Sequence, residues 1–354
     1  MRRVTKLLAV AASAALALTA CGSSGSGGSS TTTGGAGGSS SGAGNLKVGL
    51  AYDIGGRGDK SFNDSAAAGL DKAKTELGLE IKELSAKEGE SDADKEARLR
   101  LLAQGGYNPV IAVGFLYGNA LKKVAAQFPK TQFGVVDSVV EGATNVTGLT
   151  FAEQEGSFLV GAAAALKSKT GNVGYIGGCL IPLLQKFEAG FAAGAKAVKP
   201  DIKVQVKYLS NPPTCKGFSD TAGAVEAANG QYDGGADVIF AAAGGSGTGV
   251  FQSAKAKSKL AIGVDSDQHE SASADLKPVI MSSMLKRVDV AVFDFAKSIK
   301  DGSPLTGVQV FDLKKDGVGY ATSGGMVDDI KTKLEDYKQQ IISGAIKVPA
   351  EPGK

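Results

Sequence analysis

The chain has 354 residues, of which 43% are hydrophobic and 21% are charged, a composition typical of a folded protein and not of a disordered one. Its formal net charge is +3, but three of the 39 basic residues lie in a leader that we expect to be removed. The remaining 36 basic residues balance the 36 acidic ones, so we expect no basic surface that would bind nucleic acid. His269 is the single histidine, which argues against catalysis by a His–carboxylate pair and against any site with several His ligands.

Residues 1–20 are predicted to form a secretory signal peptide. Three basic residues precede an apolar stretch over 7–18, which is shorter than the roughly 20 residues that cross a bilayer as a helix. The stretch leads into Leu-Thr-Ala-Cys21, which resembles a bacterial lipobox, although an ordinary cleavage site beside a chance cysteine is the alternative. We expect the Cys21 thiolate to be acylated, which places the protein on the extracytoplasmic face of the cell membrane as a lipid-anchored lipoprotein, with palmitate as the expected kind of acyl chain.

Residues 21–45 are predicted to comprise this lipidated cysteine and a tether. The segment from 22 to 45 consists of Gly, Ser, Thr, two Ala and one Asn, and it carries no charge. Such a composition predicts a flexible linker that spans about 25–30 Å.

From residue 46 onward, short apolar runs alternate with segments of helical length. Residues 46–354 are more than one hydrophobic core usually holds, which predicts two domains. Strands are predicted at 46–52, 110–114, 133–137, 173–177, 204–209, 238–243, 260–265 and 279–285. Helices are predicted around 64–77, 92–104, 117–127, 153–168, 183–198, 219–230, 248–257 and 327–343. The alternation predicts an α/β fold with parallel sheets and helices on both faces.

A second strand–helix series starts after Phe151, which predicts two similar, Rossmann-like lobes with a ligand cleft between them. The N-terminal lobe is expected to comprise 46–150 plus about 285–303, and the C-terminal lobe 151–284 plus about 304–354. Residues 308–322 are predicted to form a hairpin that turns at 314–317. Ligands of parallel sheets bind beyond the carboxyl ends of the strands, where this chain has Asp53, Gly114, Asp137, Gly178, Gly244 and Asp265.

Two glycine-rich loops follow predicted strands. The loop over 55–64 has neither the spacing of a Walker loop nor that of a dinucleotide fingerprint, and its polar residues suit capping of the next helix. Capping does not explain Phe62, an aromatic residue in a polar loop, which suits stacking on a planar ligand. The loop over 244–249 contains no Lys or Arg, so we interpret it as a close backbone approach to a neutral ligand and not as a phosphate cradle.

Three interpretations of Asp137 and Asp265 stay open: an acid–base pair, acceptors for sugar hydroxyls or ring N–H groups, or simple caps. Lys286 suits either a contact with a ligand hydroxyl or the neutralisation of buried carboxylates. Cys179 and Cys215 are expected to pair in an exported protein, and the bridge would hold the segment of Phe218 against the strand end at Gly178. The two cysteines lack the spacing of a metal or redox site, and no metal or cofactor is predicted.

Six segments in order resemble the basic membrane lipoprotein family, the substrate-binding proteins of nucleoside ABC importers, which have a type I periplasmic-binding fold. They are 58–63, 151–161, 177–178 with 187–194, 235–240 with the glycine loop that follows, 263–268 and 281–289. The resemblance runs from about residue 46 to 343.

The resemblance implies that Phe62 and Phe218 hold a purine nucleoside between their rings. It also implies that Asn63 and Asp137 read the edge of the base, with Asp53 nearby.

For the sugar, the resemblance implies that Asp265 accepts hydrogen bonds from both ribose hydroxyls, while Gly245 and Lys286 complete the contacts. The expected function is a non-catalytic receptor that closes on a nucleoside and presents it to an ABC permease. The alternatives are a receptor of the same fold for a sugar or other small metabolite, and a nucleoside hydrolase that uses Asp137 and Asp265. The absence of Trp argues against a sugar site, and the mainly acidic cleft candidates argue against a nucleotide.

Overall fold

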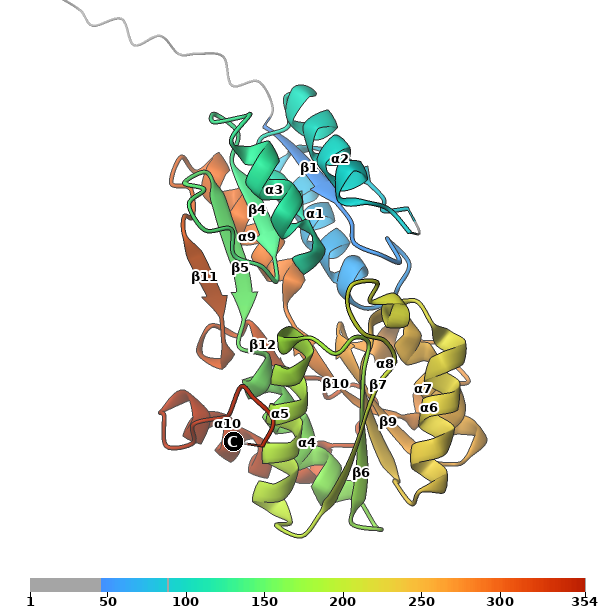
Figure 1. Ribbon diagram of the computed structural model, residues 1–354. Coiled ribbons are helices and arrows are strands. Elements are labelled where there is room, and N and C mark those ends of the chain that lie inside the picture. The colour runs from blue at the N-terminus through green and yellow to red at the C-terminus, as the bar shows by residue number, and fades with distance from the viewer. Residues whose placement is uncertain (1–45, 88, 354) are drawn as a thin grey trace, which may run out of the picture. The chain divides into compact units, whose positions relative to one another are not determined.

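A computed structural model describes residues 46–87 and 89–353, which belong to one compact unit. The predicted signal peptide, Cys21 and the tether lie outside the described residues. The fold consists of two six-stranded sheets flanked by helices, and it confirms the predicted α/β fold with parallel sheets. In Figure 1 the elements of the first sheet lie in the upper half of the picture and those of the second in the lower half.

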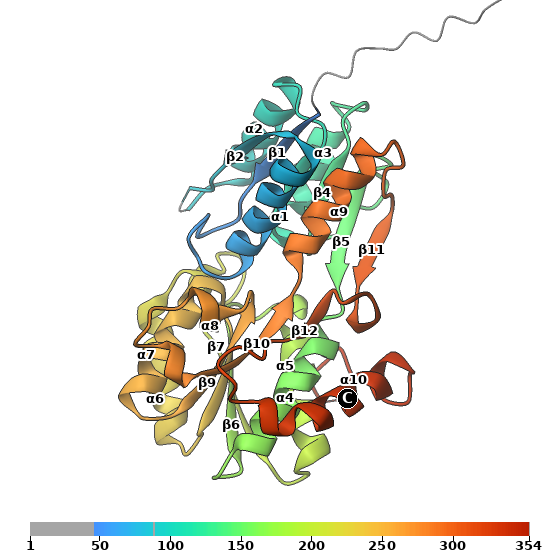
Figure 2. The same cartoon turned by 180° about the vertical axis from the view of Figure 1, so that it is seen from behind.

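All strand pairs of the first sheet are parallel, in the order β11-β5-β4-β3-β1-β2. The strands are β1 (Lys47–Ala51), β2 (Glu80–Leu84), β3 (Val110–Ala112), β4 (Phe133–Val136), β5 (Val146–Phe151) and β11 (Val308–Phe311). Helices α1 (Phe62–Leu77) and α9 (Val288–Lys300) pack together on one face, and α2 (Asp92–Gln104) and α3 (Gly118–Ala125) on the other (Figures 1 and 2). Accordingly, Val48 and Leu50 of β1 belong to the core under α1, and Ala51 belongs to the core under α2.

The second sheet repeats this order as β12-β10-β9-β8-β6-β7, and β12 runs antiparallel to its neighbour β10. Its strands are β6 (Asn172–Gly177), β7 (Lys203–Tyr208), β8 (Val238–Ala242), β9 (Leu260–Asp265), β10 (Ile280–Lys286) and β12 (Val318–Tyr320). Its helices are α4 (Glu153–Lys167), α5 (Pro182–Val198), α6 (Thr221–Asp233), α7 (Gly247–Ala256), α8 (Gln268–Ser271) and α10 (Lys331–Ile342). Short 3₁₀ turns lie at η1 (Phe115–Tyr117), η2 (Lys216–Phe218), η3 (Gly244–Ser246), η4 (Lys277–Val279), η5 (Leu313–Lys315) and η6 (Asp328–Ile330).

The chain crosses from one sheet to the other three times: after β5, after β10 and between β11 and β12. The hairpin predicted over 308–322 is therefore wrong. Asp316 does form a turn, with φ of 52°, but β11 pairs with β5 and β12 pairs with β10. Because β11 belongs to the first sheet, the last crossing follows Phe311 and does not precede residue 304 as expected.

Helices α4 and α5 approach each other at backbone distance because glycines lie at their interface. A Cβ atom on Gly161 would lie 2.1 Å from the Phe191 carbonyl oxygen, and one on Gly194 would lie 1.9 Å from that of Phe158. Interiors packed this densely accept an added methyl group only if the helices move apart.

We expect Gly194→Ala to lower the free energy of unfolding by about 1–3 kcal/mol, the usual cost of overpacking. Gly230 is the matched control, because it is also helical but has nothing within 4 Å of the position of its Cβ. Gly230→Ala is expected to raise stability by about 0.5–1 kcal/mol, since alanine favours the helix. Urea unfolding of both variants tests this, and effects of the same sign would contradict it.

Candidate functional site

A narrow cavity lies where the carboxyl ends of the two sheets face each other. Its unfilled volume is about 620 Å³, the solvent at its mouth included. We refer to this cavity as the slot. All eight residues predicted to bind ligand line it: Asp53, Phe62, Asn63, Asp137, Phe218, Gly245, Asp265 and Lys286.

The loop between β1 and α1 is held by carboxylates. Asp59 accepts hydrogen bonds from the backbone N–H groups of Ser61, Asn63 and Asp64, at 2.9, 2.9 and 3.1 Å. Asp64 in turn accepts from the N–H groups of Gly58 and Lys60. The bonds to the Asn63 and Asp64 N–H groups satisfy free amides in the first turn of α1, so Asp59 caps this helix.

The Asn63 side chain is used within this loop. Its Nδ2 donates to the carbonyl oxygen of Ile54 at 3.2 Å and to Asp59 at 3.0 Å, and its Oδ1 accepts from the N–H of Asp53 at 3.0 Å. Both amide hydrogens are thus engaged, and no donor is left for a ligand. In this structure the Asn63 side chain positions the loop that carries Phe62. Recognition of a base edge by its amide hydrogens would require them to face the cavity, and here they are used within the loop.

Asp137 and Asp265 occupy equivalent places in the two sheets. Asp137 follows β4 and Asp265 ends β9, and the two strands have the same position in the two sheet orders. Their φ angles are 65° and 64°, in the left-handed region that aspartate tolerates better than most residues. The repeated Val-Asp-Ser sequence therefore directs one carboxylate from each sheet into the cavity.

Lys286 is a buried ammonium at the end of β10. Its Nζ lies 2.5 Å from Asp137 Oδ2 and 3.7 Å from Glu153 Oε1, and its side chain is 2% exposed. The rings of Phe62, Phe151 and Phe187 surround the same nitrogen, with centroids 5.0, 5.0 and 5.7 Å away.

The carboxylates around Lys286 keep it charged. Burial acts to lower the pKa of Lys286, but Asp137, Glu153 and Asp265 outweigh it and raise that pKa above its ordinary value. The pKa of Glu153 is raised because burial outweighs the attraction of Lys286. Lys286 thus joins acidic groups of both lobes into one buried charge network.

The second carboxylate oxygen of Asp137 has no hydrogen-bond donor among the described residues. The side chain is only 4% exposed, so water reaches it poorly. A buried acceptor without a donor is costly, and a ligand N–H or O–H group in the cavity would satisfy it.

The two lobes meet beside Asp265. Ser61 Oγ donates to Asp265 Oδ2 at 2.6 Å, Ser266 Oγ donates to the Ser61 carbonyl oxygen at 3.0 Å, and Gln268 Nε2 donates to that of Lys60 at 3.0 Å. Burial raises the pKa of Asp265 to about 7, against the opposing effects of Lys286 and Ser61.

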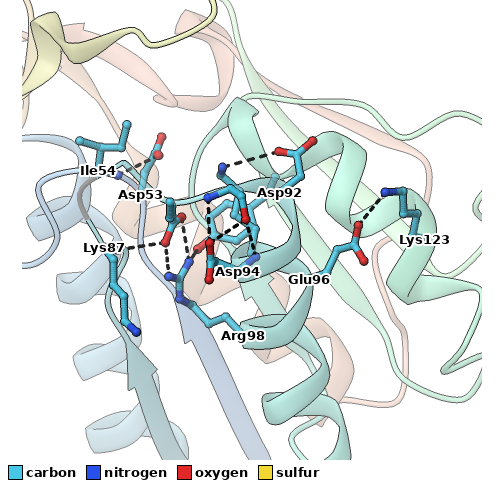
Figure 3. Close-up of polar contacts among 12 residues, drawn as sticks. Asp53, Ile54, Lys87, Asp92, Asp94, Glu96, Arg98 and Lys123 are labelled. Carbon is cyan, nitrogen blue, oxygen red and sulfur yellow. Dashed lines mark hydrogen bonds and ion pairs between the residues drawn. The ribbon is translucent and has the colours of Figure 1, made fainter.

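Asp53 is a third carboxylate that lines the cavity, and it follows β1 in the first lobe. It lies beside the ion pairs at the start of α2, of which Figure 3 labels Asp92 and Arg98. Burial raises the pKa of Asp53 to about 7. Two groups oppose that rise: the Ile54 N–H, which donates to Asp53 Oδ1 at 2.8 Å, and the charge of Lys95. The carboxylate of Asp53 also packs where a side chain on Gly114 would lie, since a Cβ there would be 2.1 Å from Oδ2.

Phe218 lines the cavity from the second lobe. It ends η2, and its ring lies over Gly178, where a Cβ atom would be 2.5 Å from Phe218 Cδ1. Cys179 and Cys215 form a disulfide bond beside it. Gly245 lines the cavity with its backbone, and a Cβ there would meet nothing closer than 3.6 Å.

Sequence reasoning did not place several other lining or supporting residues in the site. They are Ile54, Ser61, Phe115, Leu116, Glu153, Leu183, Leu184 and Phe187. Glu153 and Phe187 lie within segments that carry the family resemblance, and Phe115 and Leu116 are apolar residues directly after a strand. Those two signals could have found them.

Neither a metal site nor a membrane span is found in the part of the chain that the structure describes. Within 46–87 and 89–353, His, Cys, Asp and Glu side chains do not gather in threes in a way that could hold a metal ion. Over the same residues, every helix is too short or too polar to cross a bilayer.

Two doubly wound sheets with a slot between their carboxyl ends define a solute receptor of the type I periplasmic-binding class. Residues 46–352 match the family described as ABC transporter substrate-binding protein, PnrA-like, and the chain belongs to this family of non-enzymatic solute receptors. The ABC transporter nucleoside-binding protein BmpA of Lactococcus lactis subsp. cremoris is 35% identical over 87% of this chain and 90% of its own length. An uncharacterized lipoprotein of Pyrococcus abyssi is 35% identical over 78% and 69%, respectively. The solute-binding protein of Aeropyrum pernix K1 shares the fold, with a TM-score of 0.75 and 28% identity over 87% of this chain and 94% of that one.

Proposed function

We propose that the protein binds a nucleoside, preferably with a purine base, in the slot between its lobes and delivers it to an ABC permease. We also propose that Cys21 anchors it to the outer face of the cell membrane by a lipid. The observation that carries the proposal is the slot itself, which combines phenyl rings from both lobes with a buried Asp137 oxygen that lacks a donor. The nucleoside-binding relative and the lipoprotein relative support the ligand and the anchor.

A flat heterocycle suits a narrow slot lined by Phe62 and Phe218. Stacking of a base on an aromatic ring is worth about 1–3 kcal/mol, so two rings can supply a large part of a micromolar affinity. The charges favour a neutral ligand, because Asp53, Asp137 and Asp265 line the slot and Lys286 is already paired. A nucleotide would bring its phosphates to these carboxylates.

We assign the base and the sugar of the ligand to opposite ends of the slot from the hydrogen-bonding groups that each end offers. Asp137 offers a free acceptor, whereas the amide hydrogens of Asn63 are used in the loop, so the base edge needs an N–H donor. Asp265 would accept hydrogen bonds from the ribose hydroxyls. Gly245, whose protein surroundings leave room for a Cβ, would let the sugar approach the backbone.

The lobe contacts around Ser61 and Asp265 make closure part of binding. A ligand that touches Phe62 on one lobe and Phe218 on the other stabilises the closed arrangement in which these contacts form. A closed receptor with a filled slot is then the species that the permease would recognise.

Calorimetric titration with guanosine, inosine, adenosine, uridine, purine riboside, ribose and glucose tests the proposal. We expect a dissociation constant on the order of micromolar or tighter for a purine nucleoside. Purine riboside, which has no exchangeable N–H on its base, should bind at least about tenfold more weakly than inosine, because one hydrogen bond to a charged acceptor is lost. Binding of glucose alone would refute a nucleoside receptor, and equal affinities for inosine and purine riboside would refute the role of Asp137.

A further inference from the structure

The two rings of the slot are held in different ways. Phe62 begins the 16-residue helix α1 and follows a loop fixed by Asp59. Phe218 instead ends a three-residue turn, and the residues before it at 211–214 are all exposed. Cys215, which follows that stretch, is buried, with 1% of its surface exposed. Secondary structure therefore secures the first ring far better than the second.

The disulfide joins the segment of Phe218 to the surface on which its ring lies. Gly178 carries that surface, and Cys179, the next residue, is bonded to Cys215. Ser210 Oγ donates to the Gly178 carbonyl oxygen at 2.7 Å and accepts from the Gly217 N–H at 3.0 Å. The bridge thus fixes both sides of one contact.

The contacts at Gly217 make the position of the segment exacting. A Cβ atom on Gly217 would lie 2.0 Å from the Gly178 carbonyl oxygen, so the two backbones touch. The short segment from Cys215 to Phe218 is therefore set against one strand end. Both cysteines belong to the second lobe, so the bridge leaves closure of the lobes free.

We propose that the Cys179–Cys215 disulfide positions the Phe218 ring for stacking, so that reduction of the bridge weakens ligand binding through Phe218. This inference rests on the proposed function for the stacking role. A ring that is already in place loses less conformational freedom when the ligand binds, and the disulfide supplies that order in advance. Both cysteines are buried, but Cys215 lies between exposed residues at 211–214 and 216, in the segment that reduction would release.

A mutant cycle with inosine as the probe tests the proposal. We expect Cys179→Ala with Cys215→Ala to weaken binding about 3- to 20-fold in calorimetric titration, the range expected when one side chain must be ordered on binding. In a Phe218→Ala background the same pair should change affinity less than about twofold. In a Phe62→Ala background the full factor should remain, because that ring is held independently.

Loss of the same factor in all three backgrounds would show that the bridge acts on general stability, and it would overturn the proposal. Thermal unfolding of each variant separates the two effects, because the melting temperature should fall with loss of the bridge whichever ring is present.

A second measurement needs no ligand and no substitution. Hydrogen–deuterium exchange is compared in the oxidised protein and after reduction by a phosphine, with the freed thiols titrated. We expect faster exchange at 215–219, which includes the Gly217 amide, and unchanged exchange at 58–64. Unchanged exchange at 215–219 would overturn the proposal. If the native protein fails to bind inosine, the proposed function fails, and the exchange result still decides whether the bridge positions Phe218.

Discussion

Replacement of Lys286 by Met is expected to lower the free energy of unfolding by about 3–5 kcal/mol, the cost of leaving buried charges without a partner. The Nζ of Lys286 lies between Asp137 and Glu153, whose side chains are 4% and 1% exposed. Without the ammonium these carboxylates repel each other in a medium that solvates them poorly. Guanidinium unfolding at pH 7.5, followed by circular dichroism, measures the difference.

Lys186→Met is the matched control for this variant. Lys186 also pairs with Glu153, at 3.2 Å, but its side chain is 35% exposed, so its removal should cost about 0–1 kcal/mol. Equal costs for the two lysines would contradict the buried charge network.

The cost of Lys286→Met should also shrink on acidification. Burial raises the pKa of Glu153 above its ordinary value, and it raises that of Asp265 to about 7. Acidification therefore protonates these carboxyls before exposed ones and removes their need for a counter-charge. The variant should therefore lie closer to the native protein in stability at pH 5 than at pH 8.

Most of the sheet framework could be predicted from the sequence because buried parallel strands are continuous apolar runs. The strands β2 and β5 are missing from that prediction. In β2, Glu80–Leu84 is an edge strand of mixed polarity with no fully buried residue, and in β5 the run is interrupted by Thr147, Gly148 and Thr150. Such segments become strands through their neighbours and not through their own composition.

The hairpin predicted at 308–322 fails for a related reason. Its turn residues do form a turn, since Asp316 adopts a left-handed conformation. Whether the flanking strands pair with each other depends on partners more than 150 residues earlier for β11 and more than 30 earlier for β12. The local sequence predicts the turn, but the strands that flank it pair with strands that are distant in the sequence.

The candidate site divides in the same way. The rule that ligands bind beyond strand ends was enough to single out Asp53, Asp137 and Asp265, and the structure brings all three to one slot. It could not tell that Asp59 caps α1 while Asn63 is used within the loop, because that depends on the path of the backbone between Gly55 and Ser61. The sequence of a polar loop is the same whether its side chains point toward a ligand or bond within the loop itself.

Asp265→Asn is expected to weaken nucleoside binding at least about tenfold and at the same time to stabilise the free protein. Loss of the charge weakens hydrogen bonds from the ribose hydroxyls, each worth about 1.5–3 kcal/mol to a charged acceptor. Burial raises the pKa of Asp265 to about 7, so its ionised form is destabilising in the folded protein, and the neutral amide should add about 1–4 kcal/mol of stability at pH 8. Calorimetric titration with inosine and with its 2′,3′-dideoxy analogue, together with denaturant unfolding, measures both effects.

The pH dependence separates this explanation from a change in packing. The folded pKa of Asp265 lies above the roughly 3.9 of an unfolded aspartate, so between about pH 4 and 7 the folded state holds more protons and this group's contribution to stability falls as pH rises. The advantage of Asp265→Asn should therefore be largest above pH 7 and disappear near pH 4, whereas the affinity of the native protein should fall as pH drops through 7. Asp267→Asn is the control two residues along the same turn, where the carboxylate accepts from Ser323 outside the cavity, and it should leave the affinity for inosine unchanged. A stability gain that does not vary with pH, or an equal loss of affinity for the dideoxy analogue, would mean that Asp265 is not the ionised group that holds the sugar.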